Sequence, residues 1–153
     1  MNSIEIINNS DWQVNLRILK KEISGLARAV FRNKSFNIVL ALISEAAILK
    51  LNKQYVKKNS STDILTFDYC TKNVFAGDIA ICVDVIEKYA LYDMDSFPVY
   101  VAETILHGLL HLTGMTHDYK KETLTKLSKK QKFLLKKNNI NIKAFNFKKK
   151  NEN

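Results

Sequence analysis

The stretch that decides the fold is DSFPVYVAETILHGLLHLTG, residues 95–114. Asp95 or Ser96 is suited to cap a helix, and Pro98 is tolerated in a first helical turn. From residues 97 to 112 the side chains are apolar almost all round. This pattern predicts a helix that is buried on most of its sides.

The ionisable residues of this helix, Glu103, His107 and His111, recur every four positions and therefore share one stripe. The two imidazoles can reach a single Zn²⁺ at about 2.0–2.1 Å per nitrogen. His117, the third and last histidine of the chain, would lie about 240° off this face if the helix continued. Gly114 is placed to end the helix, because glycine adopts the left-handed conformation without a Cβ penalty. The chain can then turn back and bring His117 to the metal.

Three histidine ligands predict a catalytic zinc site with one ion per chain, since the fourth position stays open to water. The spacing H-x3-H-x2-G-x2-H is also that of metzincin peptidases. Those enzymes carry a glutamate directly after the first histidine as general base, where this chain has Gly108. The missing base argues against proteolysis. A buried helix with incidental histidines is the alternative, and the placed glycine disfavours it.

Other chemistry-bearing residues give weaker signals. Glu103 could orient a metal ligand or a water, or be a plain solvated carboxylate. Asp118 could do the same, or cap the next helix. Cys82 is expected in the core and Cys70 as an ordinary thiol, and two cysteines do not indicate a disulfide framework. Trp12 and the tyrosines are expected to pack in the core.

Outside this helix, hydrophobic periodicity predicts alternating strands and helices in a single domain. Strands are expected at residues 3–8, 37–43, 63–69 and 77–83, and helices from Ser10 with Gln13 in a capping box, from Ser44, over 84–92 and over 119–137. The run 37–43 is expected to be covered on both faces of a sheet. The last two strands are expected to be antiparallel neighbours.

The C-terminal part of the chain carries the positive charge. Residues 119–153 hold 12 lysines against two glutamates, whereas residues 1–118 hold 12 basic and 13 acidic residues. A basic end favours polyanions such as nucleic acid, although a general lysine and asparagine bias of the chain is an equal alternative. We expect one domain over residues 1–137, then a basic Asn/Lys-rich tail over 138–153. The tail is expected to fray, unless INIKAFNF lies against the body.

No stretch has the roughly 20 apolar residues of a membrane-spanning helix, and the start MNSIEIINNSDW does not have the pattern of a secretory signal. With only two cysteines, a reducing cytoplasm is the expected compartment, without a membrane partner.

Three quoted segments resemble one known family. HGLLHLTGMTHD (107–118) resembles the H-G-x-L-H-L-x-G-x-x-H signature of the YbeY family, the bacterial ribosomal RNA maturation endoribonucleases. LNKQYVKKNSSTDILTFDY (51–69) looks like its L-N-x-x-Y-R segment followed by T-D-V-L-S-F, and GDIAIC (77–82) looks like its G-D-I-x-I strand. The resemblance covers about residues 1–137.

The resemblance implies an α+β fold in which a mostly buried, metal-bearing helix packs with a small mixed sheet of about four strands and flanking helices. It implies metal-dependent cleavage of single-stranded RNA, in ribosomal RNA 3′-end maturation and ribosome quality control. His107, His111 and His117 would be the zinc ligands. The implied partners are ribosomal RNA and the ribosome, with a ribosomal protein or a GTPase as further candidates.

One departure concerns the cleft. The family carries arginine after the tyrosine of L-N-x-x-Y, where this chain has Val56. Lys57 or Lys58 could supply the missing positive charge, although lysine is a point charge and not a bidentate fork. The sequence leaves the nucleophile open between water at the zinc and the RNA 2′-hydroxyl. Two rival functions remain: a zinc metallopeptidase with its base elsewhere, such as Glu103, and a non-catalytic, zinc-stabilised RNA- or ribosome-binding module.

Overall fold

The computed structural model describes residues 2–115 and 121–151, with side chains from residue 128 onward in the last helix. Its centre is a four-stranded mixed sheet in the order β1-β3-β5-β4. The strands are β1 (Ser3–Asn8), β3 (Ser35–Leu42), β5 (Val74–Ile81) and β4 (Ile64–Asp68). β1, β3 and β5 run parallel, and β4 pairs antiparallel with β5. The expected α+β class, mixed sheet and antiparallel strand pair are confirmed.

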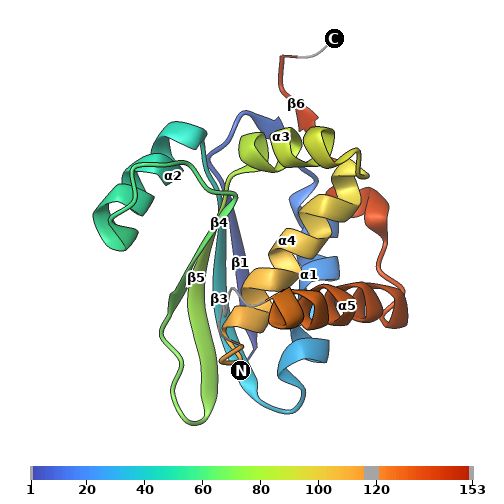
Figure 1. Ribbon diagram of the computed structural model, residues 1–153. Helices are drawn as coiled ribbons and strands as arrows, with labels where there is room; N and C mark the ends of the chain where they lie inside the picture. The colour runs from blue at the N-terminus through green and yellow to red at the C-terminus, as the bar shows by residue number, and fades with distance from the viewer. Residues whose placement is uncertain (1, 116–120, 152–153) are drawn as a thin grey trace.

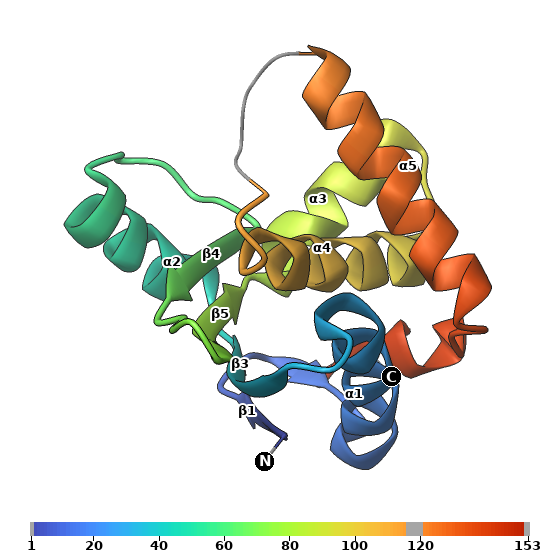
Figure 2. The ribbon, with the colours of Figure 1, turned by 90° about the horizontal axis from the view of Figure 1, so that it is seen from below.

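Helices cover one face of the sheet and one end of the other. α1 (Leu16–Phe31), α4 (Phe97–His111) and α5 (Lys121–Lys137) lie on the covered face, and α3 (Val83–Asp93) lies near one end of it (Figures 1 and 2). α2 (Glu45–Leu51) runs into a π-helical turn, η1 (Asn52–Val56), on the opposite side. Within the described part of the chain, no helix has both the length and the apolar character needed to cross a membrane.

The core lies between the sheet and the helices of the covered face. From α1 it takes Leu19, Ile23 and Leu26, as the expected helical stripe requires. From β3 it takes every second side chain, including Ile38 and Leu40, while Val39 and Ala41 on the other face are only partly covered. The expectation that residues 37–43 are covered on both faces is therefore wrong. On this other face, α2 and η1 lie across one end of the sheet (Figure 2).

The helix expected from Ser10 begins later. The Ser10 hydroxyl donates to Oδ1 of Asn8 at 2.6 Å and accepts from the Trp12 backbone N–H at 3.3 Å, so it stabilises a turn. The N-cap of α1 is Asn15, whose side chain accepts from the backbone N–H of Ile18 at 3.2 Å. The predicted capping box with Gln13 is therefore wrong.

The segment after α5 packs against the body, so the expected fraying is wrong within the described residues. A 3₁₀ turn, η2 (Ile142–Phe145), buries Phe145 completely, and Phe147 is also buried. β6 (Lys148–Lys149) then pairs antiparallel with β2 (Trp12–Gln13). The alternative, that INIKAFNF lies against the body, is confirmed, whereas the domain division at residue 137 stays a prediction.

Candidate active site

α4 carries the candidate site on its one polar stripe. Its N-cap is Ser96, Pro98 lies in the first turn, and most of its side chains are buried. Glu103, His107 and His111 are half-buried, and all three line a single cleft. The expected alignment of the three residues is therefore confirmed.

The helix ends where the sequence predicts. Gly114 has a φ of +88°, a left-handed conformation that favours glycine. Before it, the Thr113 hydroxyl donates to the Leu110 carbonyl oxygen at 2.6 Å, and the Gly114 backbone N–H donates to the His111 carbonyl at 3.1 Å. These bonds satisfy carbonyl groups at the end of α4.

The third predicted ligand, His117, and the neighbouring Asp118 lie outside the described residues. Residues 2–115 and 121–151 contain no group of three or more His, Cys, Asp or Glu side chains that could hold a metal ion. Two of the three predicted ligands, His107 and His111, are brought together on one cleft wall. The convergence of all three on one zinc stays a prediction.

The cleft beside α4 has a volume of about 680 Å³. Its walls are α4, Gln131 of α5, the start of β4 and the loop after η1. The lining residues are Asn52, Val56, Lys58, Ser60, Ser61, Thr62, Asp63, Ile64, Leu65, Thr66, Tyr100, Glu103, Thr104, His107, His111 and Gln131. Apolar side chains and hydroxyl and amide groups share this surface, so it offers several hydrogen-bond donors near the two imidazoles.

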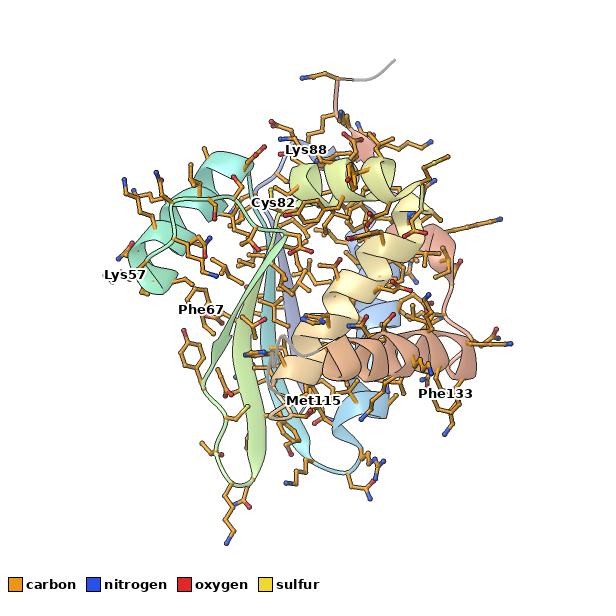
Figure 3. All side chains as sticks on the ribbon, in the orientation of Figure 1. Lys57, Phe67, Cys82, Lys88, Met115 and Phe133 are labelled. Carbon is orange, nitrogen blue, oxygen red and sulfur yellow. The ribbon has the colours of Figure 1, made fainter. Side chains whose placement is uncertain are left out.

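The loop after η1 holds one of the two lysines predicted to replace the family arginine. Lys58 lines the cleft together with Val56. Lys57 is not among the lining residues, and it lies at the outer end of the α2–η1 segment, away from α4 (Figure 3). Lys57 also takes a left-handed conformation, with φ of 62°, where the chain leaves η1. The geometry therefore favours Lys58 as the cation of the cleft.

Asn52, which the sequence did not single out, fixes this loop. Its side chain is 4% exposed, and its Nδ2 donates to the Ser60 carbonyl oxygen at 2.7 Å. The backbone N–H groups of Lys57 and Lys58 point to the carbonyl oxygen of Asn52. The side-chain amide and the backbone carbonyl of this one buried residue therefore bond to both ends of a short loop, which makes the cleft wall a defined surface.

Gln131 is the second residue that the sequence did not single out. Its amide nitrogen lies 2.8 Å from Nδ1 of His107, and its side chain is buried. Nδ1 of His107 thus contacts α5 through Gln131, and Nε2 is the ring nitrogen on the other side of the imidazole. An amide can present either its nitrogen or, after a half-turn, its oxygen to the ring. With the oxygen there, Nδ1 donates and Nε2 has a lone pair for a metal, the usual arrangement of a ligating histidine.

Burial also changes the protonation of the cleft. Desolvation is the main cause that raises the pKa of Glu103, with Lys132 opposing it and Asp95 adding to it. Desolvation, followed by the negative charges of Asp63 and Asp93, raises the pKa of Tyr100 to about 12. The Tyr100 hydroxyl therefore stays protonated, and it remains a hydrogen-bond donor at neutral pH.

Gly108 occupies the position where a metzincin peptidase has its base, and the packing of α4 explains why this residue has no side chain. A Cβ on residue 108 would lie 2.8 Å from Cδ1 of Ile64 and 3.1 Å from Cγ2 of Ile79. The backbone of α4 thus packs directly against β4 and β5. A glutamate side chain at this position would have to displace that packing.

The structure places Cys82 in the core, as expected. Both cysteines are free thiols, and Cys82 is completely buried. Cys70 is half-buried; its Sγ lies 3.4 Å from the Ala76 carbonyl oxygen and 3.5 Å from that of Leu112, which follows α4. Burial raises the pKa of both thiols, which makes them weak nucleophiles.

Fold and site together define an α+β protein in which two histidines of one buried helix wall a polar cleft. A family model described as Endoribonuclease YbeY matches residues 6–139. The chain therefore belongs to the Endoribonuclease YbeY family.

Individual relatives agree with this assignment. The chain is 36% identical over 101 residues to an Endoribonuclease YbeY of Parabacteroides distasonis, covering 64% of this chain and 71% of the relative. It is 28% identical over 129 residues to the one of Thermotoga maritima, covering 84% of each. The solution structure of TM1509 from Thermotoga maritima superposes with a TM-score of 0.58 at 25% identity, covering 88% of this chain and 91% of that one.

Proposed function

We propose that the protein is a zinc-dependent, single-strand-specific endoribonuclease that acts in ribosomal RNA 3′-end maturation and ribosome quality control. The observation that carries the proposal is the pair His107 and His111 on one wall of a polar cleft, in a chain of the Endoribonuclease YbeY family. This function requires ribosomal RNA and the ribosome as partners, with a ribosomal protein or a GTPase as further candidates, and it places the protein in the cytoplasm.

The residues present fit a zinc ion. His107, His111 and His117 would hold it, and neutral imidazole is a preferred zinc ligand. The buried amide of Gln131 against Nδ1 of His107 supplies the outer partner that ligating histidines usually have. When bound, zinc supplies a Lewis acid that polarises a phosphoryl oxygen and lowers the pKa of its water to about 7.

The other cleft residues would bind and orient the RNA. Lys58 attracts the phosphate backbone and offsets negative charge that develops at the cleaved phosphate. The Tyr100 hydroxyl, protonated at neutral pH, can donate to a phosphate or sugar oxygen. Asn52 keeps the loop that carries Lys58 in place.

The packing of α4 favours a nuclease over the rival peptidase. Gly108 contacts the sheet at a position where a catalytic base cannot be added without disturbing Ile64. Glu103 lies five residues before the position that peptidases use, and burial favours its neutral form, which is a poorer base. A peptide-library digest should therefore show no cleavage above that of buffer.

The proposal is tested with a fluorescently labelled single-stranded RNA, with and without a chelator. Wild-type protein should contain about one zinc per chain and should cut the RNA only when metal is present. His111→Ala and His107→Ala should each lose zinc and cleavage. Tyr92→Ala, at an 88% exposed position on α3, is the matched control and should cut like wild type. Cleavage that survives the chelator, or that His111→Ala leaves unchanged, would contradict the zinc role.

Two further measurements address the substrate. RNA with a single 2′-deoxy sugar at the cut should stay intact if the 2′-hydroxyl is the nucleophile, and should be cut if water is. Bacterial cells that lack their own family member can be given this chain, and the 3′ ends of their small-subunit ribosomal RNA can be mapped. Restored mature ends would support the ribosomal role, and unprocessed ends with active purified enzyme would contradict it.

A further inference from the structure

A second hollow lies on the other side of η1, over the open face of the sheet. It has a volume of about 350 Å³ and is here called the aromatic groove. Its lining residues are Val39, Ala41, Ile43, Leu51, Tyr55, Phe67, Tyr69, Asp78, Ile79 and Ala80. The small or short side chains of β3 and β5 form its floor, and aromatic rings form its rim.

The rings of the rim are exposed, in contrast to the expectation that the tyrosines pack in the core. Tyr55 is 59% exposed and Tyr69 is 58% exposed. Phe67 lies between the η1 turn and the sheet (Figure 3), and its ring meets that of Tyr55 edge to face at 5.4 Å. Phe67 therefore supports Tyr55 from one side and leaves the rest of the tyrosine ring open. Two exposed rings on one groove, supplied by separate elements, form a surface on which planar groups can stack.

The charge around this rim is positive. Residues 46–62 contain four lysines and no acidic residue. Three of these lysines are close to Tyr55 in the sequence and exposed: Lys53, Lys57 and Lys58, the last of which lines the cleft. The floor holds one opposing group, Asp78, whose negative charge is the largest cause that raises the pKa of Tyr69.

The aromatic groove adjoins the candidate active-site cleft at η1 and at β4. Tyr55 lines the groove and the next residue, Val56, lines the cleft, so η1 is the ridge between the two hollows. Along β4, Thr66 lines the cleft and Phe67 lines the groove. Because consecutive residues of a strand face opposite sides, the two hollows lie on either side of β4, which is an edge strand of the sheet. An RNA strand that occupies both hollows therefore crosses this edge beside η1.

We propose that the aromatic groove binds the single-stranded RNA next to the cleavage site, with bases stacked on Tyr55 and Tyr69. The phosphates then lie near Lys53 and Lys57 on the ridge. This inference rests on the proposed RNA-cleaving function and adds where the substrate continues. Stacking on aromatic rings combined with a basic track is how proteins bind single strands without base-specific hydrogen bonds. A duplex does not fit this mode, because its bases are already stacked on each other.

The test measures the binding of RNA by full-length protein in chelator, so that no cleavage occurs. The probe is a labelled, unstructured RNA of about ten nucleotides, followed by fluorescence anisotropy. Tyr55→Leu and Tyr69→Leu keep an apolar side chain but remove the ring face, and each should weaken binding about 5- to 50-fold. Tyr55→Phe and Tyr69→Phe keep the ring face and should bind within about twofold of wild type. Tyr92→Leu is the control at an exposed tyrosine away from the groove.

Two companion measurements locate the effect. An RNA of about three nucleotides fills only the cleft, so its weaker binding should not change in the leucine variants. A 2-aminopurine base placed at successive positions should lose fluorescence on stacking at the groove position, and Tyr55→Leu should abolish that loss. If the leucine variants bind the ten-nucleotide RNA like wild type, the groove does not hold RNA and the proposal is overturned.

The outcomes separate this proposal from the proposed function. Wild-type protein that cuts RNA in a metal-dependent way, with leucine variants unchanged in binding and cutting, would leave the function standing and overturn the groove. Wild-type protein that neither binds nor cuts single-stranded RNA would overturn both.

Discussion

Replacing Gly108 with alanine measures how closely α4 packs against the sheet, and Gly25 provides the control. Both glycines are inside helices. A Cβ on Gly25 would meet nothing within 4 Å, whereas a Cβ on Gly108 would lie 2.8 Å from Cδ1 of Ile64. The two substitutions are chemically identical and differ only in this contact.

The expected free energies follow from two terms. A helical glycine replaced by alanine gains about 1 kcal/mol of stability from helix propensity. Gly25→Ala should show this gain in full. At Gly108 the same gain is opposed by an overpacking cost of about 1–3 kcal/mol, so that Gly108→Ala should be about 0–2 kcal/mol less stable than wild type. The gap between the two variants, about 1–3 kcal/mol, is the packing cost itself.

Urea denaturation in the presence of a chelator measures this gap without a contribution from metal binding. Ile64→Val removes the Cδ1 atom and should cost about 0.5–1.5 kcal/mol by itself. Combined with Gly108→Ala it should cost less than the sum of the two, because the closest contact is gone. If Gly108→Ala stabilises the protein as much as Gly25→Ala does, the Ile64 and Ile79 side chains yield to the added methyl group and the expected overpacking cost is refuted.

Four further predictions concern the cleft and the end of α4. Gln131→Leu should weaken zinc binding about 10- to 100-fold, measured in competition with a chromogenic chelator, whereas Gln131→Glu, which keeps an acceptor, should not. Equal zinc affinities of Gln131→Leu and wild type would show that Gln131 has no role toward the metal. Burial raises the pKa of Glu103, so the folded protein binds this proton more tightly than the unfolded chain, and stability falls as pH rises from the ordinary 4.5 through the folded pKa. Glu103→Gln should therefore stabilise metal-free protein at pH 7 and lose that advantage near pH 4 in urea titrations; a gain independent of pH would contradict the burial. Gly77→Ala would place its Cβ 2.8 Å from a backbone carbonyl oxygen of β4 and should cost about 1–3 kcal/mol in the same assay, and a smaller loss would mean that β4 yields there. Lys58→Ala should slow RNA cleavage by a larger factor than Lys57→Ala, and the reverse order would refute the assignment of Lys58 to the cleft.

The parts of the fold that follow from local pattern could be predicted from the sequence. The stripe of Glu103, His107 and His111 depends only on the period of a helix, and the end of α4 at Gly114 depends only on a backbone preference. The antiparallel pair β4 and β5 also follows from two short apolar runs separated by a loop.

The parts that depend on distant contacts could not be predicted in this way. Gln131 lies 24 residues after His107, and only the crossing of α5 over α4 brings the two together. Its sequence neighbours are lysines and apolar residues, so nothing local distinguishes it. The start of α1 was misplaced for a related reason, since the Ser10 hydroxyl bonds to Asn8 in a turn, and a capping pattern does not reveal this competitor.

The open face of the sheet shows the limit of hydrophobicity as a guide to burial. The run 37–43 is apolar at almost every position, which is typical of a strand covered on both faces. Here Val39 and Ala41 instead form the floor of the aromatic groove. The floor residues have the composition of a core strand. With exposed rings and lysines beside it, such an apolar floor is suited to bind planar bases. The same apolar sequence is therefore compatible with a buried strand or with a binding surface, and the position of η1 relative to the sheet distinguishes the two.

The position of η1 between cleft and groove explains how the chain can do without the family arginine at Val56. Val56 lies on the cleft side of η1 but cannot hold a phosphate, while Lys58, two residues on, lines the same cleft. Lys57, between these two residues, has a left-handed backbone conformation that changes the direction of the chain. Lys57 therefore lies on the outer side, away from the cleft (Figure 3). Asn52 then fixes the loop through Ser60. Lys58 on this loop can replace the positive charge of the family arginine on the helical turn. Lysine, however, contacts phosphate as a point charge, so the phosphate should be held less rigidly than by a bidentate arginine. Val56→Arg, which restores the fork, should therefore raise the cleavage rate measured with saturating RNA, and an unchanged or lower rate would mean that Lys58 already fills this role.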